Sequence, residues 1–324
     1  MDRDSEPMPI LKEDDKSERQ NTNFQVLFEY GFSGSEIQAI ANSFQSPFTL
    51  GRLGGVTTSR LLNLERKLKA YGGTREDVKT IIKKRAQLLS TKKSTVNAVL
   101  KHIESHGELR KHPDWMLRIV TEHPQSLTYQ IKWISRFFSA FTDYGFTEDL
   151  VVKKVLLADP QRLRNSGKDI QNRLINLEDL GFEKGEVIAI ACRFPQIIGY
   201  DIGRTNSAFR ALMKERAILA GKVRYKADEA EARAMVKKMP QLLGLSEDTT
   251  DAKIRLRMLI WHSCMRKNPE TTNGILSDTR VLIQSRSTLL ERVAYARKND
   301  MDWRSEKYLY FKRSQFKKKF GVNL

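Results

Sequence analysis

Basic side chains recur at two fixed distances from a proline that itself recurs along this 324-residue chain. Two residues before the proline or its replacement lie Lys84, Arg193 and Lys238. Eight or nine residues after the proline lie Lys132, Lys168 and Arg204. The phosphate backbone of a nucleic acid is bound by cations spaced along a surface. The spacing therefore predicts a basic binding surface, although Glu122 and Ala158 interrupt the first of the two rows.

Two further groups of cations belong to this predicted surface. Arg162 and Arg164 flank the apolar residue of the motif that begins at Pro160. Near the C-terminus, six aromatic residues are mixed with Lys317, Lys318 and Lys319. The aromatic residues are Trp303, Tyr308, Tyr310, Phe311, Phe316 and Phe320. Such rings can stack on bases, but the end of a repeat array also needs apolar side chains to close its core. We favour closure of the core for the rings and phosphate binding for the three lysines.

The charge of the chain agrees with a polyanionic partner. Lysine and arginine number 57 against 39 acidic residues, a net charge of +18. The first twenty residues hold seven acids and four bases, so the remainder carries +21. An excess of this size opposes compaction through self-repulsion and is commonly matched by a nucleic acid. A well-solvated basic surface without a ligand is the simpler alternative.

Residue sets typical of enzymes or metal sites are absent from the sequence pattern. His102, His106, His112 and His123 lie close in sequence, but no cysteine or carboxylate pair accompanies them at metal-ligand spacing. Cys192 and Cys264 are far apart. The glycines around Gly51 lack the lysine of a phosphate-binding loop. We therefore predict no catalytic residue, no metal and no cofactor.

The proline motif sets the architecture that must position these side chains. It consists of Pro-Gln and an apolar step, at Pro124, Pro160, Pro195 and Pro240, with intervals of 36, 35 and 45 residues. Ala86-Gln87-Leu88-Leu89 is an earlier copy without the proline. Such a period is typical of an array whose units bury their apolar faces against one another.

Each unit reads as two or three helices with a turn before them. A turn such as Tyr144-Gly145-Phe146 opens the unit, and an N-cap such as Thr147 starts the first helix. The proline then ends this helix, because its ring clashes with the preceding turn. A second amphipathic helix follows, with a stripe such as Ile131, Ile134, Phe137 and Phe138 that we expect to be core.

These units predict an all-α, superhelical solenoid over residues 24–300. Residues 1–23 are expected to be an acidic, disordered tail, and residues 301–324 a basic aromatic cap. Strand signals are almost absent, and the segment 214–228 is predicted to be an extra turn or a longer helix. A loop is expected at 268–274.

The units resemble the repeats of the mitochondrial transcription termination factor (mTERF) family. Leu180-Gly181-Phe182, Pro195-Gln196-Ile197-Ile198 and the helix to Leu212 form the nearest copy. The final Phe316-Lys-Lys-Lys-Phe320-Gly321 is also similar to the usual end of the family. The resemblance implies a superhelical α-solenoid of mTERF-type repeats whose basic concave face binds nucleic acid. It also implies roles in organelle transcription, its termination, RNA metabolism or ribosome assembly.

Together these patterns predict a non-enzymatic nucleic-acid-binding protein that regulates transcription or its termination. The founding activity of the family favours double-stranded DNA over structured RNA. The alternative is an α-solenoid scaffold that binds a protein partner. No apolar run is long enough to span a membrane.

The compartment stays open at this point. The family resemblance implies a mitochondrion or chloroplast, whereas the acidic, polar N-terminus is unlike a signal or transit peptide. A bacterial cytoplasm, or a chain that has lost a presequence, agrees with that N-terminus.

Overall fold

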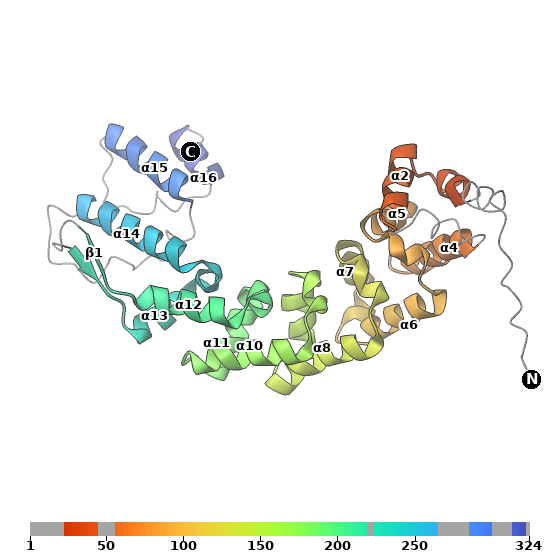
Figure 1. Cartoon of the computed structure of the whole chain (residues 1–324), viewed down its shortest axis with the longest axis horizontal. Helices are drawn as coiled ribbons and strands as arrows, with labels where there is room; N and C mark the ends of the chain where they lie inside the picture. The colour runs from red at the N-terminus through yellow and green to blue at the C-terminus, as the bar shows by residue number, and fades with distance from the viewer. Residues whose placement is uncertain (1–22, 45–55, 219–222, 265–284, 300–312, 322–324) are drawn as a thin grey trace, which may run out of the picture. The chain divides into compact units, whose positions relative to one another are not determined.

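The fold is described from a computed structural model that places residues 23–44, 56–218, 223–264, 285–299 and 313–321 (Figure 1). The chain divides into two compact units, Met1–Lys168 and Asp169–Leu324. In each unit, α-helices alternate with short 3₁₀ helices in the order that the repeats predict. The helical-repeat, all-α class is therefore confirmed for the described residues, with one small exception.

The first unit contains three copies of the motif, of which the first has Ala86 in place of the proline. Residues 23–29 are helical. The following elements are α2 (Gly34–Asn42), α4 (Val56–Lys69), α5 (Arg75–Lys84), η1 (Ala86–Leu89), α6 (Lys93–Glu104), η2 (Leu109–Lys111), α7 (Pro113–Glu122), η3 (Pro124–Thr128), α8 (Ile131–Tyr144), α9 (Glu148–Leu150), η4 (Val151–Leu156) and η5 (Pro160–Arg164). Successive helices of the same kind pack together, as α5 does on α7 and α6 on α8.

The second unit continues the same alternation. Its elements are α10 (Gly167–Asp179), which begins at the boundary, α11 (Lys184–Arg193), η6 (Pro195–Gly199), α12 (Ile202–Met213), β1 (Arg216–Ile218), β2 (Val223–Tyr225), α13 (Glu229–Lys238), η7 (Pro240–Gly244), α14 (Glu247–Cys264), α15 (Arg286–Lys298) and α16 (Arg313–Phe320). The 3₁₀ helices η6 and η7 contact each other, and α12 packs on α14.

Every copy of the proline motif forms a short 3₁₀ helix. In four copies the proline is the first residue of that helix, where its missing N–H costs no hydrogen bond. The apolar residues after the glutamine are buried as predicted: Leu88, Leu89, Leu127, Leu163, Ile197, Ile198, Leu242 and Leu243. These side chains fill the seams between successive repeats.

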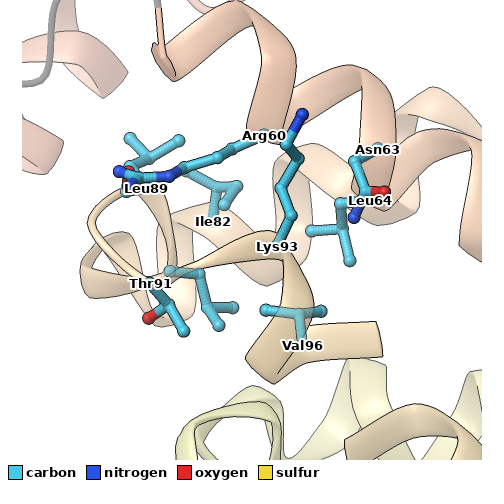
Figure 2. Close-up of a pocket in the computed structure, with 9 residues that line it drawn as sticks. Arg60, Asn63, Leu64, Ile82, Leu89, Thr91, Lys93 and Val96 are labelled. Carbon is cyan, nitrogen blue, oxygen red and sulfur yellow. The ribbon is translucent and has the colours of Figure 1, made fainter. Parts of the chain in front are cut away.

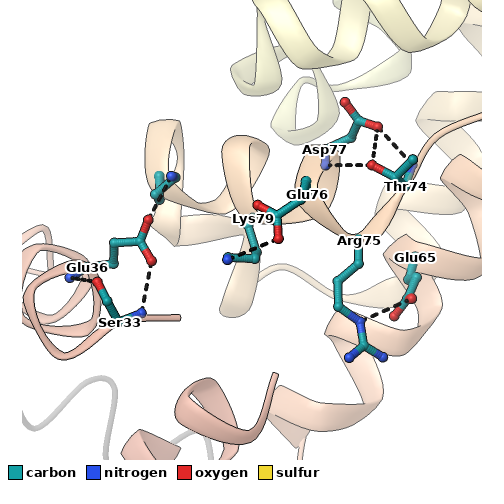
Figure 3. A network of polar contacts seen from close by, with 9 residues as sticks. Ser33, Glu36, Glu65, Thr74, Arg75, Glu76, Asp77 and Lys79 are labelled. Carbon is teal, nitrogen blue, oxygen red and sulfur yellow. Dashed lines mark hydrogen bonds and ion pairs between the residues drawn. The ribbon is translucent and has the colours of Figure 1, made fainter. Parts of the chain in front are cut away.

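The turns and caps of the repeats also agree with the sequence. Gly145 ends α8 with a φ of 110°, in the left-handed region that a side chain would disfavour. Phe146 then folds back into the core and is 3% exposed. Ser33 forms a capping box with Glu36, and Thr74 forms one with Asp77. Dashed lines mark these hydrogen bonds in Figure 3.

One repeat carries an extra residue, which the structure absorbs as a π-helix. Thirteen residues lead from the N-cap Thr147 to Pro160, whereas twelve lead from Glu183 to Pro195. The surplus residue appears in η4, where the Leu157 N–H donates to the Val152 carbonyl at 3.0 Å, five residues back. Single-residue insertions into α-helices give this geometry because widening one turn preserves the faces on either side.

The predicted helical extension at 214–228 is wrong. Strands β1 and β2 pair antiparallel there, with Arg216 opposite Tyr225. Arg216 is buried and donates from Nε to Asp251 Oδ1 at 2.9 Å, which ties the strands to α14. Each strand has three residues, too few for a period of two to be visible in the sequence. Ile131 also departs from its predicted core stripe, since it is 42% exposed at the first residue of α8.

Several predictions fall outside the described residues. They are the acidic tail over 1–23 apart from its last residue, the loop at 268–274 and most of the cap at 301–324. The proposed domain boundaries stay predictions, as does the superhelical course of the chain.

Candidate nucleic-acid interface

The cations two residues before the proline link neighbouring repeats. Lys84 Nζ donates to the Thr121 carbonyl at 2.8 Å, and the Arg193 guanidinium donates to the Lys237 carbonyl. Thr121 lies in the last turn of α7 and Lys237 in the last turn of α13, each the first helix of the following repeat. Backbone oxygens in a last turn lack intrahelical donors. The recurrence of these cations therefore has a structural cause. Lys238, at the equivalent position, is exposed.

Two other predicted ligands are also engaged within the protein. The Arg204 guanidinium donates to the Gly244 carbonyl and lies 5.1 Å from the Tyr200 ring centroid. Arg162 is 8% exposed, and its Nε donates to Asp159 Oδ2 at 2.8 Å. A buried, ion-paired guanidinium is not presented to a ligand. The structure thus moves Arg162 from the predicted binding surface into the seam.

Lys132, Arg164 and Lys168 remain exposed, with no hydrogen bond or ion pair to another described residue of the first unit. Two backbone approaches bring them into one region. Trp133 Nε1 donates to the Leu163 carbonyl at 2.9 Å, which joins the start of α8 to η5. A Cβ added at Gly167 would lie 2.5 Å from the Arg136 carbonyl oxygen, so the backbone at Gly167 lies against α8.

Arg136 belongs to the same region and was missed in the sequence analysis. It is exposed on α8, four residues after Lys132, and residues at this spacing share one helix face. That spacing was a readable signal, but it lies outside the two proline-centred rows. We call Lys132, Arg136, Arg164 and Lys168 the α8 basic cluster.

The N-terminus of α8 adds backbone donors to this cluster. Its N-cap residue, Gln130, makes no side-chain capping hydrogen bond. At the equivalent end of α12, by contrast, Asp201 Oδ1 accepts from the Arg204 N–H at 3.1 Å. Uncapped amides at a helix N-terminus attract anions through their N–H groups and the helix dipole.

A set of rings borders the α8 basic cluster. His123 Nε2 lies 3.0 Å from the Tyr129 hydroxyl, and the Tyr129 and Trp133 ring centroids are 6.4 Å apart. Burial, followed by the charges of Arg164 and Arg85, lowers the pKa of His123 to about 4, although Asp159 opposes this. The His123 ring is therefore neutral at pH 7. Trp133, at 36% exposure, presents an apolar edge beside the cations.

A small pocket lies at another seam of the first unit, between α4, η1 and α6 (Figure 2). Arg60, Lys93, Leu64 and Val96 are among the residues that line it. The Arg60 guanidinium donates to the Leu89 carbonyl, and Lys93 Nζ donates to Ser59 Oγ at 2.6 Å. A volume of about 20 Å³ holds little more than one water molecule. This space is a seam feature, too small for an organic ligand.

The C-terminal aromatic residues divide between described and undescribed positions. Phe316 is 1% exposed and packs against Tyr295 and Phe320, with ring centroids 5.8 and 4.7 Å away. This burial agrees with a role in closing the core. The side chains of Lys317, Lys318 and Lys319 are exposed on α16. Trp303, Tyr308, Tyr310 and Phe311 lie outside the described residues.

Comparison with protein families assigns the central part of the chain. A model of the mTERF family matches residues 97–225. This stretch is therefore similar to mTERF proteins, and we call residues 97–225 the mTERF region. The match confirms the resemblance read from the repeats, and mTERF proteins are nucleic-acid-binding helical-repeat proteins. The α8 basic cluster lies wholly within the mTERF region, whereas Lys84, Lys238 and the C-terminal lysines lie outside it.

A search of curated proteins found no match to the chain. Among the described residues, no helix is long and apolar enough to cross a membrane. The same part of the chain holds no group of three or more histidine, cysteine or acidic residues arranged around a metal position.

Proposed function

We propose that this protein binds nucleic acid through the α8 basic cluster and catalyses no reaction. The observation that carries the proposal is the division among the predicted cations. Lys84, Arg193 and Arg204 are exposed but donate to carbonyls of the next repeat, and Arg162 is buried. Lys132, Arg164 and Lys168 are exposed without such a contact and lie near an uncapped helix end. Those are the requirements of a phosphate backbone: spaced cations and free backbone donors.

We further propose that the ligand is double-stranded DNA and that binding regulates transcription or its termination. The support is the mTERF region itself, since termination is the founding activity of that family. A protein docked along a duplex by its phosphates could block or pause a polymerase. Structured RNA is the second candidate ligand, and phosphate contacts alone do not separate the two.

Fluorescence anisotropy with double-stranded DNA, single-stranded RNA and hairpin RNA, at several salt concentrations, tests both parts. Replacing Lys132 and Lys168 by Gln removes about two phosphate contacts. The slope of log affinity against log salt should then fall by about 2, with similar weakening for all sequences. A preference for DNA would support the role in transcription, and a preference for RNA would contradict it.

Arg204→Gln is the control for Lys132→Gln and Lys168→Gln taken singly, because it removes one charge from the start of α12, where the guanidinium donates to the Gly244 carbonyl. We expect its salt slope to stay near that of the wild type. Equal losses for Arg204→Gln and the lysine variants would mean that net charge, rather than the α8 basic cluster, controls binding. Weak and equal binding of all three ligands would overturn the proposal in favour of a protein-binding scaffold.

A further inference from the structure

His102, in the last turn of α6, and His106, two residues after the end of that helix, bring their ring nitrogens together. His102 and His106 are four residues apart, and their Nε2 atoms lie 3.5 Å from each other. This separation exceeds the usual length of a hydrogen bond to nitrogen or oxygen. The two rings meet edge to face, with centroids 4.9 Å apart.

The His106 ring is held by Glu148 and Phe138, and Glu148 is held in turn by Gly107. Its Nδ1 lies 3.2 Å from Glu148 Oε1, and Glu148 Oε2 accepts the Gly107 N–H at 2.8 Å. The ring also stacks on Phe138 at a centroid distance of 3.7 Å. Because a carboxylate only accepts, His106 Nδ1 carries the proton. In the neutral ring, Nε2 then carries a lone pair on the side that faces His102.

Comparable positions at two other seams hold a different chemistry. Asn63 donates to Asn97 at 3.1 Å, and Asn176 donates to Asn206 at 2.9 Å. In each pair, one asparagine lies sixteen residues after the proline position of its repeat. Its partner lies eleven residues after the proline position of the following repeat. The sequence places His102 and Ser135 at these positions, with Ser135 Oγ 2.9 Å from His102 Nε2. The two side-chain amides of an asparagine pair supply each other with a donor and an acceptor. At the His102 seam, by contrast, the acceptor His106 Nε2 has no donor at a normal hydrogen-bond distance.

We propose that His102 and His106 chelate one divalent transition-metal ion of the Zn²⁺, Ni²⁺ or Cu²⁺ class through their Nε2 atoms. With Zn–N bonds of about 2.05 Å, two ligands of a tetrahedral ion lie about 3.3 Å apart, close to the observed separation. Imidazole is a preferred ligand for all three ions. Glu148 then acts as the carboxylate that orients a metal-bound histidine.

The proposed site differs from a structural zinc centre in having two protein ligands. Water completes the coordination, so the ion should exchange readily. The site is partly accessible, since the His106 side chain is 14% exposed. Both ligands come from the end of α6 and the turn after it, and the residues that contact their rings come from α8 and the start of α9. This inference is independent of nucleic-acid binding.

Isothermal titration of the full chain with ZnSO₄, NiSO₄ and CuSO₄ tests the proposal, in a background in which Cys192 and Cys264 are replaced by Ser. We expect one equivalent to bind saturably. His106→Gln should weaken binding more than tenfold, and Glu148→Gln should weaken it about 10- to 100-fold. His112→Gln is the matched control, because His112 stacks on Trp115 away from the pair. It should leave the affinity unchanged.

Electron paramagnetic resonance of the Cu²⁺ form gives a readout that does not depend on stability. Two equatorial nitrogens in the wild type, and one in His106→Gln, would support the chelate. Thermal melting without metal shows whether each variant is folded. Binding that survives His102→Gln or His106→Gln in a folded protein, or no saturable binding in the wild type, would overturn the proposal.

Discussion

The first turns of α8 and α12 occupy equivalent places in their repeats but use their cations differently. Trp133 and Arg204 both lie nine residues after the proline, and both donate to a carbonyl of the next 3₁₀ helix. In α8 the donor is a neutral indole, so the neighbouring Lys132 keeps its charge exposed. In α12 the cation itself closes the seam. A count of basic residues per repeat therefore overstates the charge offered to a ligand.

The residue before the proline differs in the same two repeats. His123 pairs with Tyr129 ahead of α8, whereas Phe194 pairs with Tyr200 ahead of α12, with ring centroids 5.8 Å apart in both cases. The geometry is shared, but only the first pair contains a titratable imidazole. The repeat that contains α8 therefore combines exposed cations with a pH-sensitive seam.

A side chain at Gly167 should have the largest effect on the repeat that contains α8. Gly167→Ala places a Cβ 2.5 Å from a backbone oxygen of Arg136, which cannot move without shifting the helix. We expect the free energy of unfolding to fall by about 3 kcal/mol, at the upper end of overpacking effects. Urea denaturation followed by circular dichroism measures this change.

Gly185→Ala is the control for this prediction. Gly185 also lies near the start of a helix, α11, but an added Cβ there meets no atom within 4 Å. Helix propensity then predicts a gain of about 0.5 to 1 kcal/mol. Equal effects at the two glycines would contradict the close approach of Gly167 to the Arg136 carbonyl.

Converting the α8 seam to the α12 type should remove its sensitivity to acid. Burial and nearby arginines hold the folded-state pKa of His123 at about 4, below its ordinary 6.5. Its contribution to stability is fully present above pH 6.5 and is lost as the pH falls toward 4. We expect the wild type to lose on the order of 2 kcal/mol from this group between pH 7 and 4. His123→Phe should lose correspondingly less.

The measurement is a set of urea denaturation curves between pH 7 and 4. His112→Gln is the control, because this ring stacks on Trp115 and is partly exposed. It should keep the pH dependence of the wild type. If His123→Phe shows the wild-type slope, another group causes the acid sensitivity of the protein.

The sequence predicted the repeats because their signals are local and strongly restricted. A proline can only begin the 3₁₀ helix, and a residue such as Gly145 must adopt positive φ, so both mark the chain at fixed places. The hairpin at β1 and β2 was missed because three-residue strands give no periodicity. The surplus residue of this repeat can be counted in the sequence, but no residue type marks where the helix widens into a π-helix.

The binding surface was predicted less well than the fold. Side-chain type gives the charge of Arg162 and Arg204, but not the Asp159 carboxylate or Gly244 carbonyl that engages each one. Those partners come from a turn of the same repeat or from the next repeat, and their positions follow from packing. The His102–His106 pair was readable as two histidines four residues apart. Its carboxylate, Glu148, lies 42 residues from His106 and could not be anticipated.

The smallest expected effect sharpens the comparison between the two helix starts. Gln130→Asp gives α8 the acidic N-cap that Asp201 provides for α12. We expect the free energy of unfolding to rise by about 0.5 to 1 kcal/mol, because the carboxylate accepts an N–H and complements the helix dipole. Affinity for nucleic acid, measured by anisotropy, should nevertheless fall about threefold, the equivalent of less than 1 kcal/mol.

Gln130→Asn separates the two possible causes of that fall. An asparagine caps the helix nearly as well but adds no charge. If repulsion of phosphate weakens binding, only the Asp variant should lose affinity. If the backbone N–H groups themselves hold the phosphate, both variants should lose it, since both occupy those donors. Unchanged affinity in both variants would mean that the N-terminus of α8 does not face the nucleic acid, and the exposed lysines would then act without it.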